Sequence, residues 1–181
     1  MQPVEAPVNA VVFDVGRVLY QWQLRALFEK LIADPAELDW FLAHVVTEEW
    51  HFQHDAGRPL AEMVPERQAQ FPDHAHLIAA YAARFITNFG AEFWAMFRPT
   101  APVFDRFRDI VVSGEEKLAK PDPAIFRLAE RRFGHRAEGM LFIDDNAANI
   151  AAAAALGWPV HHFSSAAALR QDLAGRGLID G

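Results

Sequence analysis

The chain has 181 residues, which is enough for one domain of about 150 residues and a smaller insertion. With 52% hydrophobic and 12% aromatic residues it can bury a sizeable core, which excludes an intrinsically disordered protein. A net charge of −7 disfavours nucleic acid and anionic membranes as partners. The absence of cysteine excludes disulfides and thiol catalysis, and neither a signal sequence nor a long apolar run is recognisable. We therefore expect a cytoplasmic protein, monomeric or homodimeric.

The first predicted element is a strand over residues 9–15, a short unbroken apolar run typical of a strand buried on both faces of a parallel sheet. From residue 23 to about 71, apolar residues recur at helical spacing. Turn-forming residues at 55–59 separate a pair of helices from a further helix that begins near Leu60. We interpret residues 21–83 as an all-helical insertion.

In the remaining chain, predicted strands alternate with predicted helices. Apolar runs predict strands at 85–86, 110–112, 140–143 and 159–160, and helical patterns lie at 91–97, 124–133 and 147–156. This alternation is typical of a three-layer α/β fold with a parallel sheet, to which we assign residues 1–20 and 84–181.

One junction does not fit a continuous fold. A helical pattern over residues 74–84 enters the expected strand at 85–87 with no turn between them, although parallel strands need a connection of about a dozen residues. The sequence therefore predicts that about 20 to 30 residues of a βα unit are absent near positions 83–87.

Polar residues follow the ends of the predicted strands. They are Asp14 after the first strand, Thr87 and Asn88 after the second, Lys120 shortly after the third, and Asp144 with Asp145 after the fourth. Because the carboxyl ends of parallel strands share one edge of a sheet, these groups are expected to converge.

Three converging carboxylates repel one another unless a cation neutralises them. Mg²⁺ prefers one or two carboxylates, and Asp14 and Asp145 can supply them, with the carbonyl of Gly16 close by. A carboxylate can also attack phosphorus to form an acyl phosphate, while Lys120 and Thr87 clamp the transferring oxygens.

Four stretches together resemble the haloacid dehalogenase-like hydrolases, in the subgroup whose helical cap is inserted after the first strand. They are Phe13-Asp14-Val15-Gly16, Ile86-Thr87-Asn88, Lys120-Pro121-Asp122-Pro123-Ala124-Ile125-Phe126, and Phe142-Ile143-Asp144-Asp145-Asn146 with Asn149. The resemblance implies a Rossmann-like core of three layers with an inserted α-helical cap. It covers residues 9–20 and 85–163.

The resemblance also implies roles for these residues. Asp14 is the nucleophile, Lys120 pairs with it, and Thr87 and Asn88 hold the phosphoryl group. The Mg²⁺ ligands are Asp14, Asp145 and the Gly16 carbonyl, with Asp144 in support of them.

Two residues depart from the pattern of most phosphatases in the family. Gly16 stands where these have a second aspartate that serves as acid and base, and Arg17 stands where a small residue is usual. The local pattern is similar to that of the bacterial glucose-1-phosphate phosphatase-like branch, which also has glycine there.

Other polar and aromatic residues have structural interpretations. Asp122 caps the helix that begins at Pro123. His51, His54 and Asp55 could form a metal site. The better interpretation is that the two histidines lie on the surface or line the cap. From the cap, His54 would contact the substrate. Trp22, near the rim, is a further candidate for substrate contact.

The sequence thus predicts a Mg²⁺-dependent hydrolase of a small phosphorylated metabolite that works through an aspartyl phosphate. Two alternatives remain open. One is a 2-haloacid dehalogenase-type hydrolase, and the other is a catalytically weak regulatory or binding protein of the same fold.

Overall fold

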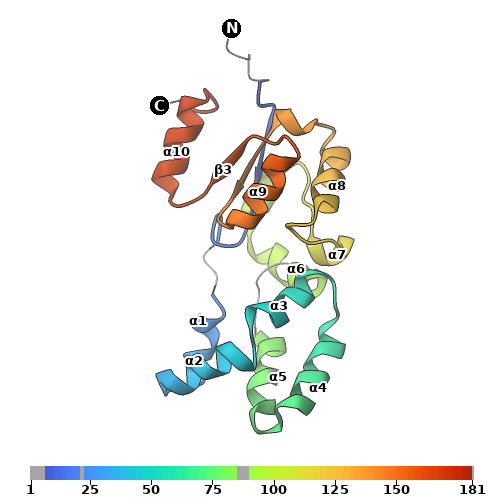
Figure 1. Cartoon of the computed structure of the whole chain (residues 1–181), viewed down its shortest axis with the longest axis vertical. Helices are drawn as coiled ribbons and strands as arrows, with labels where there is room; N and C mark the ends of the chain where they lie inside the picture. The colour runs from blue at the N-terminus through green and yellow to red at the C-terminus, as the bar shows by residue number, and fades with distance from the viewer. Residues whose placement is uncertain (1–6, 21–22, 85–89, 181) are drawn as a thin grey trace. The chain divides into compact units, whose positions relative to one another are not determined.

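The computed structural model describes residues 7–20, 23–84 and 90–180, and the chain divides into two compact units (Figure 1). The sheet unit combines residues 1–21 with 120–181, and the helical unit spans residues 22–119. Residues 90–119, which the sequence analysis assigned to the core, group with the helical unit.

The sheet unit is built on three parallel strands in the order β1 (Ala10–Phe13), β2 (Met140–Asp144) and β3 (Val160–His162). The predicted α/β fold with a parallel sheet is confirmed. Phe13 lies opposite Ile143, and Asp144 lies opposite His162. This register brings the residues that follow β1 and β2 to the same edge of the sheet.

The strand predicted at 110–112 is wrong. The backbone N–H of Ile110 donates to Oδ1 of Asp109 at 2.7 Å, and helix α7 (Ser113–Glu116) begins directly after Val112. None of the described strands pairs with residues 110–112. The strand predicted at 85–86 lies outside the described residues, and so does the junction where we expect a segment to be absent.

Three helices accompany the sheet, namely α8 (Pro123–Phe133), α9 (Ala147–Ala155) and α10 (Ala166–Gly175) (Figure 1). The cap predicted for Asp122 is confirmed, since its side chain accepts a hydrogen bond from the Ala124 N–H at 2.8 Å. Helix α9 packs on β2 and β3. The Phe142 ring of β2 meets the Phe126 ring of α8 edge-on, with 5.3 Å between centroids.

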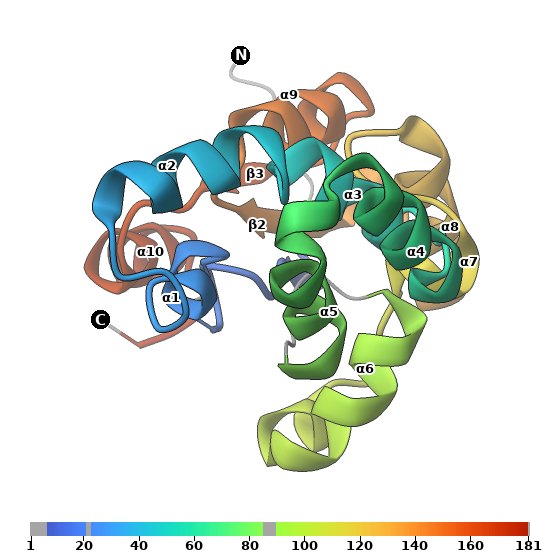
Figure 2. The ribbon, with the colours of Figure 1, turned by 90° about the horizontal axis from the view of Figure 1, so that it is seen from below.

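The helical unit contains the helices expected from the 3.6-residue spacing and, in addition, α7, which the sequence did not predict (Figures 1 and 2). They are α1 (Arg25–Phe28), α2 (Pro35–His44), α3 (Glu48–Asp55), α4 (Leu60–Gln70), α5 (Ala75–Arg84), α6 (Ala91–Phe97) and α7, with short 3₁₀ turns at Pro72–His74, Arg98–Thr100 and Pro102–Arg106. Its core is a cluster of apolar side chains from α1 to α6, among them the fully buried Phe28, Phe41, Met63, Ile78 and Phe93.

Two glycines allow close packing between helix ends in this unit. A Cβ atom on Gly114 would lie 2.4 Å from the backbone nitrogen of Ala91, and one on Gly90 would lie 1.9 Å from Nε2 of His54. Both distances are far below van der Waals contact, so only glycine fits at these positions without displacing its neighbours. Within the described residues, no helix is long and apolar enough to cross a membrane.

Candidate active site

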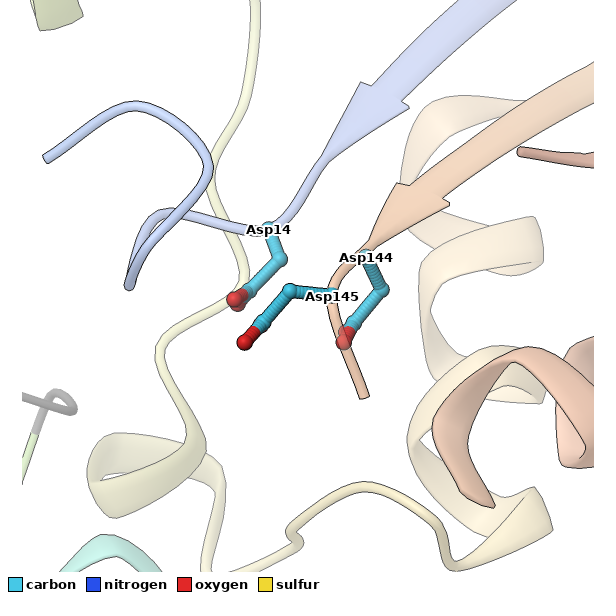
Figure 3. A group of neighbouring side chains, drawn as sticks. All are labelled: Asp14, Asp144 and Asp145. Carbon is cyan, nitrogen blue, oxygen red and sulfur yellow. The ribbon is translucent and has the colours of Figure 1, made fainter. Parts of the chain in front are cut away.

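Three carboxylates meet at the edge of the sheet where β1 and β2 end (Figure 3). Asp14 directly follows β1, and its backbone N–H extends the ladder by donating to the Ile143 carbonyl at 2.8 Å. Asp144 ends β2 and Asp145 follows it. One oxygen from each carboxylate lies within 4.8 Å of the others, and within the described residues this is the only such group of potential metal ligands. The convergence expected for these three residues is therefore observed.

Lys120 bridges two of these carboxylates. Its Nζ donates to Oδ1 of Asp14 and to Oδ2 of Asp144, each at 2.7 Å. The ammonium also lies 5.4 Å from the centre of the Phe142 ring, within the range of a cation–π contact. The pairing of Lys120 with Asp14 that the resemblance implied is present.

Asp144 is fully buried, and both of its oxygens accept hydrogen bonds. Oδ1 accepts from the Asn146 N–H at 2.7 Å, and Oδ2 accepts from Nδ2 of Asn149 at 3.0 Å in addition to Lys120. Asn146 also caps α9, because its side chain accepts from the Ala148 N–H at 2.9 Å. Asp144 thus supports the site by orienting Lys120 and the turn that carries Asp145.

Burial raises the pKa of the Asp14 carboxyl above its ordinary value, and the charge of Asp144 adds to that rise while Lys120 opposes it. Burial alone would lower the pKa of Lys120, but the charges and hydrogen bonds of Asp14 and Asp144 outweigh it and raise that pKa. Lys120 therefore stays charged at neutral pH. The charge and hydrogen bond of Lys120 therefore offset the effect of burial on the pKa of Asp14 only in part.

This donor set fits a divalent cation. Asp14 and Asp145 keep 18% and 25% of their side-chain surface exposed, so both can take up an ion from solvent. Hard oxygen donors with an excess of negative charge are what Mg²⁺ prefers in proteins. Asp14 and Asp145 would be the direct ligands, because the oxygens of Asp144 are already occupied. The Gly16 carbonyl stays a predicted ligand.

The loop after Asp14 is closed by backbone hydrogen bonds and carries a second cation. Leu19 and Tyr20 donate to the Val15 carbonyl at 3.0 and 2.9 Å, and Arg17 donates to the Tyr20 carbonyl at 2.7 Å. Nη1 of Arg17 lies 3.7 Å from Oδ2 of Asp145. Sequence reasoning noted that Arg17 was unusual but assigned it no role.

His162 is a contact of the site that sequence reasoning missed. Its Nε2 donates to the backbone carbonyl of Asp145 at 2.9 Å. The paired histidines on a strand neighbouring β2 are the signal that could have found it, but the contact depends on the register between β2 and β3.

Of the other predicted site residues, the structure describes only His54. Thr87, Asn88 and Trp22 lie outside the described residues. His54 is only 2% exposed inside the helical unit, where its Nδ1 lies 3.0 Å from the Arg58 carbonyl and its ring packs edge-on against Phe93. A substrate contact by His54 does not fit this burial, since the ring would first have to become accessible.

The alternative metal site at His51, His54 and Asp55 is not formed. All three side chains are buried, but their potential ligand atoms do not gather as those of the carboxylate group do. Nδ1 of His51 is hydrogen-bonded to the Tyr81 hydroxyl, and its Nε2 lies 3.4 Å from Oδ2 of Asp55. These residues form a buried polar network within the helical unit.

Comparison with solved structures supports the fold. The chain is similar to a haloacid dehalogenase (HAD) family enzyme from Bacteroides thetaiotaomicron in a magnesium complex, with a TM-score of 0.66, 19% identity, and coverage of 89% of this chain and 96% of that one. A predicted HAD-like hydrolase from Porphyromonas gingivalis has a TM-score of 0.62 at 19% identity, with coverage of 93% and 98%. An L-2-haloacid dehalogenase from Xanthobacter autotrophicus has a TM-score of 0.51 at 18% identity, with coverage of 96% and 85%.

No curated protein matches the sequence. The family model of the haloacid dehalogenase-like hydrolases, in contrast, matches residues 8–157, a span that includes Asp14, Lys120 and both aspartates at the end of β2. The chain therefore belongs to the haloacid dehalogenase-like hydrolases.

Proposed function

We propose that the protein is a Mg²⁺-dependent hydrolase of small phosphate monoesters that forms an aspartyl phosphate on Asp14. The observation that carries this proposal is the Asp14 carboxylate itself, which is held by Lys120 at 2.7 Å within a cluster of three carboxylates at the sheet edge. Three clustered carboxylates need a cation to offset their negative charge. A metal cation together with a lysine also supplies the positive charge that stabilises a phosphoryl group during transfer.

In the first step an oxygen of Asp14 attacks phosphorus, and the bond between phosphorus and the ester oxygen breaks. Gly16 has no proton to give, so the departing alkoxide takes one from water. In the second step water attacks phosphorus, the Asp14–phosphorus bond breaks, and inorganic phosphate leaves with the carboxylate restored. When bound to Asp14 and Asp145, Mg²⁺ would neutralise charge on the transferring oxygens.

The other residues of the site fix Asp14 for this attack. Lys120 holds Oδ1, so the second oxygen of Asp14 is the one that reacts. Asp144 keeps Lys120 in place by accepting a second hydrogen bond from its Nζ at 2.7 Å. Thr87 and Asn88 would add hydrogen bonds to the phosphoryl oxygens, as the resemblance implies.

One similar protein and one resemblance in the sequence add support. The Bacteroides thetaiotaomicron enzyme has been solved with magnesium and inorganic phosphate together. The sequence around Gly16 resembles that of the glucose-1-phosphate phosphatase-like branch, so sugar phosphates are the first substrates to test. A small phosphorylated metabolite is the substrate class that we propose.

The test is hydrolysis of p-nitrophenyl phosphate and a panel of sugar phosphates with and without Mg²⁺. Asp14→Asn should lower turnover at least a thousandfold, because an amide is a poor nucleophile of nearly the same shape. Asp122→Asn is the matched control, since asparagine also caps helices and Asp122 is exposed. Turnover of Asp14→Asn within tenfold of the wild type contradicts the proposal.

The same preparation decides between the alternatives. Halide release from a 2-haloacid that persists in the presence of a chelator, with no phosphate release, would make the protein a dehalogenase. Binding of Mg²⁺ and inorganic phosphate without turnover of any ester would favour a regulatory or binding protein.

A further inference from the structure

Arg17 is a second cation beside the carboxylates, and the mechanism above gives it no task. Its Nη1 lies 3.7 Å from Oδ2 of Asp145, and 47% of its side chain is exposed. This separation exceeds that of an N–H···O hydrogen bond, so the two groups form a half-exposed ion pair. An ion pair of this kind contributes little to stability and can exchange one anion for another.

The backbone fixes the position of Arg17. Its φ of 58° lies in the left-handed region, which residues other than glycine rarely adopt. The N–H of Arg17 donates to the Tyr20 carbonyl at 2.7 Å, inside a loop closed by two further hydrogen bonds to the Val15 carbonyl. The loop that begins at the nucleophile therefore holds the guanidinium at the rim of the carboxylate site.

Charge balance shows why a second cation is needed. Lys120 already donates to two carboxylates, Asp14 and Asp144, each at 2.7 Å. A divalent cation together with Lys120 would balance the three carboxylates and no more. A phosphoryl group brings a further charge of about −1.5 to −2, which Arg17 is positioned to offset.

We propose that Arg17 binds the phosphoryl oxygens of the substrate, and that it leaves Asp145 for them once a divalent cation neutralises that carboxylate. This inference rests on the proposed function and deepens it. The planar guanidinium presents paired N–H donors that match two phosphoryl oxygens, which a lysine ammonium cannot do. Arg17 is then a catalytic residue that contacts the group being transferred.

The experiment is calorimetric titration of the full chain with inorganic phosphate at saturating Mg²⁺. Arg17→Met should weaken phosphate binding by tenfold or more, because a charged donor to the phosphoryl oxygens is lost. Arg17→Lys should recover only part of the affinity. Arg136→Met is the matched control, since that side chain is 90% exposed and pairs with Glu138 instead.

Titration with Mg²⁺ alone separates binding from a merely structural role. Arg17→Met removes a positive charge next to Asp145, so the affinity for Mg²⁺ should be unchanged or higher. Weaker Mg²⁺ binding together with wild-type phosphate affinity would show that Arg17 only holds Asp145 in place, which overturns the inference.

The inference and the proposed function fail in different ways. A wild type that hydrolyses esters while Arg17→Met binds phosphate normally overturns the role of Arg17 alone. A wild type that binds phosphate through Arg17 but shows no turnover dependent on Asp14 overturns the phosphatase and leaves the anion site standing. A wild type that binds no phosphate at saturating Mg²⁺ overturns the role of Arg17.

Discussion

At the scale of single residues, Lys120 is the group on which the carboxylates depend. The side chain of Asp144 is fully buried and that of Asp14 is 18% exposed, and both rely on one ammonium. When one partner of a buried ion pair is removed, the other is left as an uncompensated charge, which costs more than the pair contributed.

We therefore expect Lys120→Met to lower the free energy of unfolding by about 2 to 4 kcal/mol at neutral pH. Saturating Mg²⁺ should restore part of this loss, because a cation replaces the missing charge among the carboxylates. Urea unfolding with and without Mg²⁺ measures both effects. Lys30→Met, on an exposed position of the helical unit, is the control and should be neutral. An equal loss with and without the ion would argue against a cation site here.

His162 acts at the same scale, through the carbonyl of Asp145. Groups that orient metal ligands typically change metal affinity by about 10- to 100-fold. His162→Phe should thus weaken Mg²⁺ binding about tenfold, and His162→Gln, which keeps an N–H donor, should weaken it less. Calorimetry with Mg²⁺ is the measurement. Equal affinities in all three proteins would show that the turn holds Asp145 without this hydrogen bond.

At the scale of elements, the sequence predicted most boundaries because local chemistry determines them. Helix α8 begins where Asp122 caps it, and α9 begins where Asn146 does. The strand expected at 110–112 could not be rejected from its apolar residues alone, because a strand also needs a partner, and none of the described strands pairs with these residues.

The residues of the candidate site likewise fall into those that the local sequence predicts and those that depend on the folded structure. Asp14, Asp144 and Asp145 could be predicted because they follow apolar runs, and a parallel sheet gathers such positions at one edge. The contacts of Arg17 and His162 with Asp145 could not, because one depends on a left-handed backbone and the other on the pairing of β2 with β3. The burial of His54 depends on its packing against Phe93 and Gly90, which no local pattern reveals.

The junction between α6 and α7 yields a prediction at this scale. A Cβ on Gly114 would lie 2.4 Å from a backbone nitrogen at the start of α6, and backbone cannot move aside as a side chain can. Gly114→Ala should destabilise the helical unit by about 2 to 4 kcal/mol. Gly175→Ala, which meets nothing within 4 Å, is the control and should change stability by no more than about 0.5 kcal/mol.

Thermal unfolding followed by circular dichroism compares these two variants. A melting temperature of Gly114→Ala equal to that of the wild type would mean that α6 and α7 shift apart without cost, and would contradict the close contact.

At the scale of the whole molecule, the buried network of the helical unit links stability to pH. Burial lowers the pKa of His51 from 6.5 to about 3, and the nearby His54 adds to the effect. Below pH 6.5 the unfolded chain binds a proton at His51 that the folded chain does not bind until about pH 3. Stability should therefore fall as the pH decreases across this window, by up to about 1.4 kcal/mol per pH unit.

Urea unfolding of the wild type between pH 7 and pH 4 measures this slope. His51→Gln has no titrating group at this position and keeps a polar side chain near Tyr81, so its stability should vary less with pH over the same range. Parallel pH profiles for the two proteins would assign the acid sensitivity to other groups.

The pairing of β1 with β2 has a consequence for how the protein is made. Asp14 and Lys120 are 106 residues apart, and the entire helical unit is encoded between them. At about 5 to 20 residues per second, the ribosome needs roughly 5 to 20 seconds to synthesise the intervening chain. During that interval, and until Met140–Asp144 has also been synthesised, the apolar strand Ala10–Phe13 is without its partner. Asp14 is thus synthesised well before the lysine that pairs with it and before the strand that pairs with β1, so the apolar strand has no partner until β2 has been made.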